Sequence, residues 1–422
     1  MQKPILAALL LAATTPATAQ IIAIKAAHVI TDAAQPARGA STIIVENGRI
    51  TAINDASAPI PAGATIIDQS TRTLLPGLMD AHTHLTGDPD KPFWNEAIET
   101  SEHQVAVGLA NARKTARAGF TTVRDLGSAN LTAFAVRDAI NEGLFAGPRI
   151  LASGPALSII GGHGDVSGYR PEVNAALAQG NTCTGPDQCA ARVREASQRG
   201  ADVIKITATG GVLSQQGRGL GQHFTDSEMT AIAQTAHGLG LKVAAHAHGA
   251  RGIEAAARDG IDSIEHGTFA DAAAIKAMVA NRTWYVPTLM ALVGIDDRLG
   301  KGIFTPTVEK KVRETLALRG KALEAATKAG VRIAYGTDSA VYEHGRNGEE
   351  AAQMVKYGKM TPRAVLVSAT SGAAELLGIT AETGTLVPGK AADIIAVDGD
   401  PLTDATELAK VKWVMARGKV ID

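Results

Sequence analysis

Short apolar runs of strand length alternate with alanine-rich helical segments along the middle of the chain. The apolar runs cover residues 74–79, 121–126, 149–153, 203–207, 242–245, 263–264, 284–287 and 332–335. Helical periodicity separates most of them, as in residues 104–118, 227–239, 252–258 and 309–329. Eight such units over about 300 residues predict an α/β chain folded as a (β/α)8 TIM barrel. A doubly wound sheet is disfavoured, because no glycine-rich phosphate loop follows the first run.

Both ends of the sequence are β-like, unlike the middle. Asn47 and Gly48 lie between two apolar runs, which is a strong hairpin signal. Short apolar runs return at residues 392–397 and 413–420. We therefore expect residues 20–73 and 382–422 to form one small β-sandwich domain from both termini. Residues 74–381 would form the barrel.

The first residues have the pattern of a secretory signal peptide. Lys3 precedes an apolar run at residues 5–13, and the small residues Ala17 and Ala19 follow that run. We expect residues 1–19 to be removed, so that the mature chain starts at Gln20 in an exported, periplasmic protein. A buried N-terminal helix is the alternative. No later stretch reaches the ~18 apolar residues that a membrane span needs.

The two cysteines, Cys183 and Cys189, lie in a turn-rich segment. In an oxidising compartment, a disulfide that closes this short loop is the expected state. A metal site would need further soft ligands, and none is visible nearby in the sequence.

The charge balance bears on the partners of the chain. Lys and Arg number 41, Asp and Glu number 42, and the net charge is −1. Nothing in this balance favours nucleic acid or an anionic membrane. We expect a small-molecule substrate as the partner, no membrane association after the leader is removed, and a homo-oligomer.

Six side chains that can bind metal lie at the ends of the apolar runs, where a barrel places its active site. They are His82 and His84 after the first run, Lys205 in the fourth, His246 after the fifth, His266 after the sixth and Asp338 after the eighth. His82 and His84 are two residues apart on an extended segment, so both can reach one ion. Taken singly, a histidine at a strand end is commonly a structural residue, and Asp338 is commonly a helix cap. Their shared position at one face of the barrel favours a metal site.

These residues lie in motifs that resemble the amidohydrolase superfamily over nearly the whole mature chain. The motifs are residues 75–84 (LPGLMDAHTH), the lysine of the fourth strand, residues 263–267 (SIEHG), residues 336–338 (GTD) and residues 384–393 (GTLVPGKAAD). The sequence is most similar to the imidazolonepropionase-like branch. That branch contains exported Xaa-Pro dipeptidases and enzymes that hydrolyse ochratoxin-type N-acyl amino acids. The two-domain shape of the family agrees with the predicted sandwich and barrel.

The resemblance implies a centre of two divalent metal ions, which we expect to be Zn²⁺. In the family pattern a lysine is carboxylated by CO2 and bridges both ions, and Lys205 would carry this carbamate. His82, His84 and Asp338 would bind one ion, and His246 and His266 would bind the other. Carboxylation would also replace a buried cation, which is unfavourable in an apolar strand, by an anion that the metals neutralise. Asp338 is the predicted catalytic residue, because it can take a proton from the attacking water and pass it to the leaving amine.

Four further residues on loops above the predicted barrel are candidates for substrate binding. They are His163 after the third strand, Arg218 and His223 in the glycine-rich loop after the fourth, and His248 after the fifth. Arg218 and His223 would pair with a substrate carboxylate. Arg218 has an equally good interpretation as a solvated loop residue, and His248 as a structural one.

We therefore expect a hydrolase that cleaves the amide or peptide bond of a dipeptide or an N-acyl amino acid, ochratoxin-like amides included. A cyclic-amide or lactone hydrolase with the same metals is the first alternative, because a barrel does not dictate the scissile bond. A mononuclear deaminase would not need Lys205. A metal-binding protein without turnover would not need Asp338 placed for proton transfer.

Overall fold

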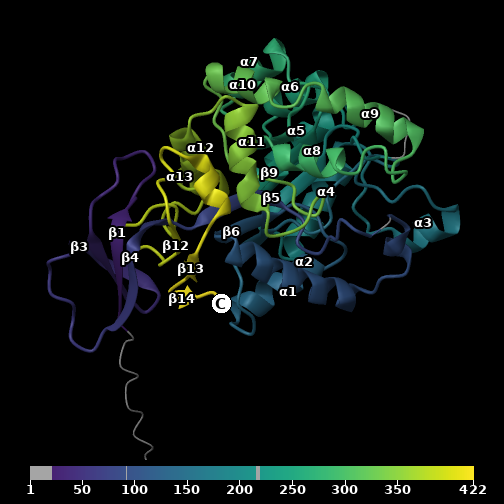
Figure 1. The fold of residues 1–422 in the computed structure, drawn as a ribbon. Helices are drawn as coiled ribbons and strands as arrows, with labels where there is room; N and C mark the ends of the chain where they lie inside the picture. The colour runs from purple at the N-terminus through teal and green to yellow at the C-terminus, as the bar shows by residue number, and fades with distance from the viewer. Residues whose placement is uncertain (1–20, 92, 215–218) are drawn as a thin grey trace, which may run out of the picture.

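The computed structural model describes residues 21–91, 93–214 and 219–422. The predicted leader and the substrate-binding candidate Arg218 lie outside these residues. Figure 1 shows a small β domain beside a larger barrel that helices surround. No helix within the described ranges is both long and apolar enough to cross a membrane.

The small β domain is one sheet of seven strands in the order β14-β13-β12-β4-β1-β2-β3. β1 pairs in parallel with β4, and β4 pairs antiparallel with β12, so strands from both termini meet in this sheet. Apolar side chains that include Ile24, Ile43 and Ile394 form a core of its own. The prediction of a β domain formed from both termini is confirmed. Its strands are β1 (Ile21–Val29), β2 (Ser41–Glu46), β3 (Arg49–Asp55), β4 (Thr65–Pro76), β12 (Ile394–Val397), β13 (Trp413–Ala416) and β14 (Lys419–Val420).

The turn between β2 and β3 is the hairpin that the sequence predicts. Asn47 and Gly48 both have positive φ angles, 50° and 77°. Type I′ turns require positive φ at both central positions, and Asn followed by Gly adopts it at low cost. These two residues therefore fix the register of β2 against β3.

The barrel strands form two parallel sheets that irregular segments join. Leu157 links the sheets on one side, because its backbone N donates to the carbonyl of Lys205 at 2.8 Å. On the other side, residues 332–339 lie between β11 and β5 and hydrogen-bond to Tyr285 and His82. The barrel therefore closes, with an irregular segment in the eighth position. Its regular strands are β5 (Leu78–Thr83), β6 (Phe120–Asp125), β7 (Arg149–Ala152), β8 (Val203–Thr207), β9 (Lys242–Ala247), β10 (Ser263–His266) and β11 (Trp284–Val286).

The structure corrects two element boundaries. The predicted first run spans two strands, since β4 ends at Pro76 and β5 begins at Leu78. Gly77 separates them, and a Cβ there would lie 2.1 Å from Thr121 Oγ1. The predicted helix at residues 309–329 is two helices, because Gly320 adopts a left-handed φ of 75° against Tyr357. Apolar periodicity does not show such a break, because glycine can occur within it.

Helices cover the outside of the barrel (Figure 1). Their buried faces pack on the strands, as Met229 and Ile232 of α5 do. The α-helices are α1 (Ser101–Arg117), α2 (Thr132–Asn141), α3 (Pro171–Leu177), α4 (Pro186–Gln198), α5 (Asp226–Gly238), α6 (Ala250–Arg258), α7 (Ala272–Ala280), α8 (Leu289–Asp296), α9 (Pro306–Leu316), α10 (Lys321–Lys328), α11 (Glu350–Lys356), α12 (Pro362–Ser368) and α13 (Ser371–Leu377). The 3-10 helices are η1 (Phe93–Ala97), η2 (Asn347–Glu349) and η3 (Ala405–Ala409).

Cys183 and Cys189 form the predicted disulfide, which staples the start of α4. We expect the double variant Cys183→Ser/Cys189→Ser to lose about 2 kcal/mol of unfolding free energy, because closing so short a loop constrains the unfolded chain little. Denaturant unfolding of both proteins measures this difference. Free thiols in peptide maps of the protein, prepared without a reducing agent, would contradict the oxidised state.

Candidate active site

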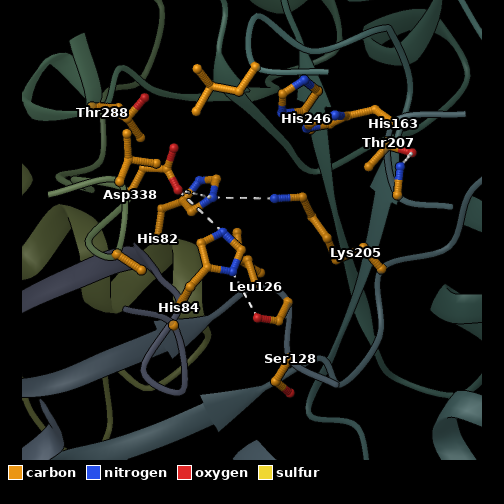
Figure 2. Close-up of a pocket in the computed structure, with 18 of the residues that line it drawn as sticks. His82, His84, Leu126, Ser128, His163, Lys205, Thr207, His246, Thr288 and Asp338 are labelled. Atoms are coloured by element: carbon orange, nitrogen blue, oxygen red, sulfur yellow. Dashed lines mark hydrogen bonds and ion pairs between the residues drawn. The ribbon is translucent and has the colours of Figure 1, made fainter. Parts of the chain in front are cut away.

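The C-terminal ends of the barrel strands open into a cavity of about 650 Å³. All six predicted metal ligands line it. Figure 2 shows His82, His84, Lys205 and Asp338 pointing toward one another. The strands β5, β8, β9 and β10 supply one ligand each, and the remaining two lie just after β5 and in the irregular eighth segment. They are His82, His84, Lys205, His246, His266 and Asp338.

His82, His84 and Asp338 form one cluster of potential ligands, with donor atoms all within 4.8 Å of one another. The Oδ1 atom of Asp338 lies 3.2 Å from His84 Nε2 and 3.5 Å from His82 Nε2. Burial disfavours the charged form of Asp338, but His82 and His84 outweigh burial and lower the pKa of its carboxyl below the ordinary value. Asp338 is therefore an anion at neutral pH.

His246, His248 and His266 form a second cluster, again with donor atoms within 4.8 Å. The sequence predicted two of these as ligands and left His248 between a substrate contact and a structural residue. Burial is the largest cause that lowers the pKa of all three, that of His248 to about 4. His246 Nε2 is buried and has no hydrogen-bond partner among the described residues. These imidazoles are neutral at pH 7, so their lone pairs can bind metal.

Lys205 shares the cavity with both clusters and is 4% exposed. Its Nζ lies 3.3 Å from His82 Nε2. Figure 2 marks this contact with a dashed line. Burial lowers its pKa to about 8, although Glu265 and Asp338 oppose this. More of the side chain is thus the neutral amine, the form that reacts with CO2, than in a solvent-exposed lysine.

The hydrogen bonds of the histidine rings test whether the site fits metal. In three cluster histidines besides His82, Nδ1 lies against a protein oxygen, which leaves Nε2 directed at the clusters. Metal-binding histidines are commonly oriented in this way, and a set of imidazole and carboxylate donors suits Zn²⁺. The residues present therefore fit two divalent ions. The pairs are His84 with the Gly127 carbonyl at 2.8 Å, His248 with Thr268 Oγ1 at 2.9 Å and His266 with Thr288 Oγ1 at 2.7 Å.

Three residues in the ligand clusters or hydrogen-bonded to them have backbone conformations that the sequence does not reveal. His266, Thr288 and Asp338 have φ angles of 70°, 49° and 61°. Positive φ is uncommon outside glycine and concentrates at functional sites, where the surrounding structure imposes it. Thr288 was not predicted as a site residue, because its role depends on a hydrogen bond to a residue in another strand.

The four candidates for substrate binding have different positions. His163 and His248 line the cavity, whereas His223 is half-buried and is not among the described lining residues. His163 Nδ1 lies 2.6 Å from Ser214 Oγ, and its ring centroid is 4.2 Å from that of His246. Burial lowers the pKa of His163 to about 3, so this ring is neutral. The role of His223 in carboxylate binding stays a prediction, as does that of Arg218.

One wall of the cavity is apolar. Leu289, Leu292 and Ile295 of α8 line it together with Val212 and Leu213 of the loop after β8. The carboxylate of Glu350 holds the start of α8, since it accepts from the backbone N of Leu289 and Met290 at 2.8 and 2.6 Å. The site therefore places a fixed apolar surface beside its polar clusters.

The sequence and the structure are similar to those of known hydrolases. The amidohydrolase family matches residues 73–421. The chain is 33% identical over 417 residues to ochratoxinase of Aspergillus niger, covering 94% of this chain and 85% of that protein. A Xaa-Pro dipeptidase with bound methionine has a TM-score of 0.86 and 35% identity, covering 95% of this chain and 99% of that one. A prolidase complexed with N-methylphosphonate-L-proline has a TM-score of 0.85 and 29% identity, with the same coverage. The chain therefore belongs to the amidohydrolase family and is a hydrolase of carbon–nitrogen bonds.

Proposed function

We propose that this chain is a binuclear, zinc-dependent amidohydrolase that cleaves the amide or peptide bond of a dipeptide or an N-acyl amino acid. The observation that carries the proposal is the pair of three-ligand clusters that share one cavity with Lys205. His82, His84 and Asp338 would hold one ion, His246 and His266 the other, and a carbamate on Lys205 would bridge them. When bound, the two ions would polarise the scissile carbonyl and supply a nucleophilic water at neutral pH.

Asp338 is the residue that would move the proton. Its carboxylate is ionised and lies within 3.5 Å of both His82 Nε2 and His84 Nε2, at the centre of the first cluster. It would accept a proton from the attacking water and donate it to the leaving amine nitrogen. An amine leaves poorly as an anion, so this transfer is needed for amide cleavage.

His163 would orient the substrate carbonyl. If its Nδ1 accepts from the Ser214 hydroxyl, the proton of this neutral ring is on Nε2. That N–H would donate to the carbonyl oxygen, whose negative charge grows as water attacks. The ring of His163 lies beside that of His246, so His163 would act at the edge of the second ligand cluster.

The apolar wall indicates what the substrate carries next to its scissile amide. Leu289, Leu292 and Ile295 would bury an aliphatic or aromatic group, which stabilises binding in proportion to the apolar area removed from water. The substrates named for the related proteins, an ochratoxin and Xaa-Pro dipeptides, support an amide of an amino acid with an apolar side chain.

The place of action is a proposal of its own. The leader pattern and the disulfide between Cys183 and Cys189 both fit export to an oxidising compartment, which we propose is the periplasm. The homo-oligomeric state is a further expectation, which light scattering of the mature chain measures.

The proposal is tested by assaying the zinc-loaded protein on dipeptides, N-acyl amino acids, cyclic amides and lactones. We expect an open-chain amide with an apolar residue to be the best substrate, with kcat/KM of at least ~10⁴ M⁻¹s⁻¹. Chelation should remove the activity, and added zinc should restore it. Lys205→Ala protein, purified in parallel, controls for a contaminating peptidase. Faster turnover of a lactone or cyclic amide, or activity that survives chelation, would refute the proposal.

A further inference from the structure

A charged pair lies buried inside the barrel, next to His82 of the first ligand cluster. Arg124 of β6 is 1% exposed and Glu265 of β10 is fully buried. Arg124 Nη2 donates to Glu265 Oε1 at 2.8 Å, and Glu265 Oε2 lies 2.9 Å from His82 Nδ1. We infer that Arg124 and Glu265 are positioning residues, which hold His82 in the orientation and tautomer that present its Nε2 lone pair to metal. This inference rests on the proposed binuclear site.

The polar atoms of the pair are all accounted for. Arg124 Nε donates to the carbonyl of Ala81 at 2.6 Å, and its Nη1 donates to Ser263 Oγ at 3.2 Å. Ser263 Oγ donates in turn to Glu265 Oε1 at 2.6 Å. Two donors, Arg124 Nη2 and Ser263 Oγ, thus hold Oε1 of Glu265, and its other oxygen, Oε2, lies against His82 Nδ1. A buried ion pair is seldom retained for stability alone, because desolvation offsets most of its attraction.

The charge on Arg124 decides where the proton of His82 lies. A carboxylate paired with a guanidinium accepts hydrogen bonds and does not donate them, so the ring proton must be on His82 Nδ1. Nε2 is then an acceptor. Lys205 Nζ, at 3.3 Å from Nε2, can then donate to it. A neutral side chain that donated to Nδ1 would instead place the ring proton on Nε2, where it would block metal.

His82 differs from the other histidines whose Nδ1 is held. His84 is held by a backbone carbonyl, and His248 and His266 are held by threonine hydroxyls. An anionic acceptor makes an imidazole more basic toward metal than a neutral one does. His82 also lies between Lys205 and Asp338. Its position therefore affects both the predicted bridging residue, Lys205, and the predicted proton-transfer residue, Asp338.

The alternative is that the pair only stabilises the fold, by linking β5, β6 and β10 through hydrogen bonds that include the one to the Ala81 carbonyl. Removing one member leaves a charge unpaired, so Arg124→Met and Glu265→Gln should each lower the Tm of the metal-free protein by about 3–5 °C. The double variant Arg124→Met/Glu265→Gln removes both charges at nearly constant volume and should recover most of that loss. This double variant therefore separates an effect on zinc binding from an effect on the stability of the protein.

The decisive measurement is the Kd for zinc, from competition with a chromophoric chelator, beside the Tm of the metal-free protein. We expect the double variant to have nearly the Tm of the parent and a Kd for the weaker-bound zinc that is about 10–100-fold higher. Arg149→Met is the matched control. Arg149 lies near the buried Asp393, at 3.8 Å, at the N-terminal end of β7, away from the clusters, so its loss should change Tm and leave zinc affinity unchanged.

A measurement on the unaltered chain completes the test. Histidine-ring ¹⁵N–¹H spectra of the metal-free protein should show His82 as the Nδ1–H tautomer, with its signals assigned by their absence from a His82→Gln variant. An Nε2–H tautomer, or unchanged zinc affinity in the double variant, would overturn the inference while leaving the proposed function intact. A parent protein that binds no zinc would overturn both.

Discussion

Replacing Lys205 by alanine should abolish turnover and reduce the zinc content of the protein. Lys205 is 4% exposed, its Nζ lies 3.3 Å from His82 Nε2, and it shares the cavity with both ligand clusters. Without a bridging carbamate, each ion loses an anionic ligand and the imidazoles are the main donors left. We expect kcat to fall by more than about 10³-fold, beyond the ~10–100-fold typical of residues that act through a ligand. Assays with zinc in excess, and metal analysis by mass spectrometry, measure both effects.

Short carboxylic acids distinguish a lost bridge from a damaged fold. Acetate or propionate fits the space that the lysine vacates and supplies a carboxylate, so partial rescue is expected for Lys205→Ala. Lys311→Ala is the matched control. Lys311 is also a buried lysine, but its Nζ donates to the carbonyls of Gly211 and Ser214 at 2.9 and 2.7 Å, outside both clusters. That variant should keep two zinc ions, and added carboxylic acids should not raise its activity. Two zinc ions with normal turnover in Lys205→Ala would contradict the bridging role.

Asp338→Asn should reduce kcat by about 10²-fold or more, within the usual range for a general acid–base group. Asparagine keeps the size of the side chain and one oxygen for metal, but it cannot accept the proton. The backbone also tolerates it, because Asp338 has a φ of 61° and asparagine is among the residues that adopt this region readily. Steady-state kinetics of the zinc-loaded variant, with its zinc content, check the result.

The two possible roles of Asp338 lead to different results. If Asp338 only binds metal, its substitution should lower the zinc content, and excess zinc should restore turnover. If Asp338 transfers the proton, its substitution should lower kcat even at full zinc occupancy. Near-normal kcat with two ions bound would mean that another group moves the proton.

The barrel geometry explains why the sequence could predict that these side chains share one cavity. A (β/α)8 barrel brings the C-terminal ends of its strands to one face, so His82, Lys205 and His266 meet although they are far apart in the chain. The hairpin at Asn47 was predictable for a similar reason, because its turn chemistry is local. These predictions therefore rest on local sequence patterns and on rules that hold for the whole fold.

Other features depend on pairings that a sequence does not display. The sequence places Glu265 in a motif but does not show that it is hydrogen-bonded to Arg124 across the barrel. Both residues share one signal with Lys205, which is a charge inside an apolar strand. The sequence leaves the role of His248 open, because this residue follows the end of β9 at Ala247 and joins its cluster only in the folded chain. The break at Gly320 and the irregular eighth segment depend likewise on contacts with distant residues.

The most direct test of the binuclear centre is a crystal structure of the zinc-loaded protein grown in bicarbonate, with anomalous data collected at the zinc edge. We predict two anomalous peaks, one beside His82, His84 and Asp338 and one beside His246 and His266. Electron density should extend from Lys205 Nζ by the three further atoms of a carbamate and reach both peaks. A single peak, or an unmodified Lys205 between two peaks, would contradict the account.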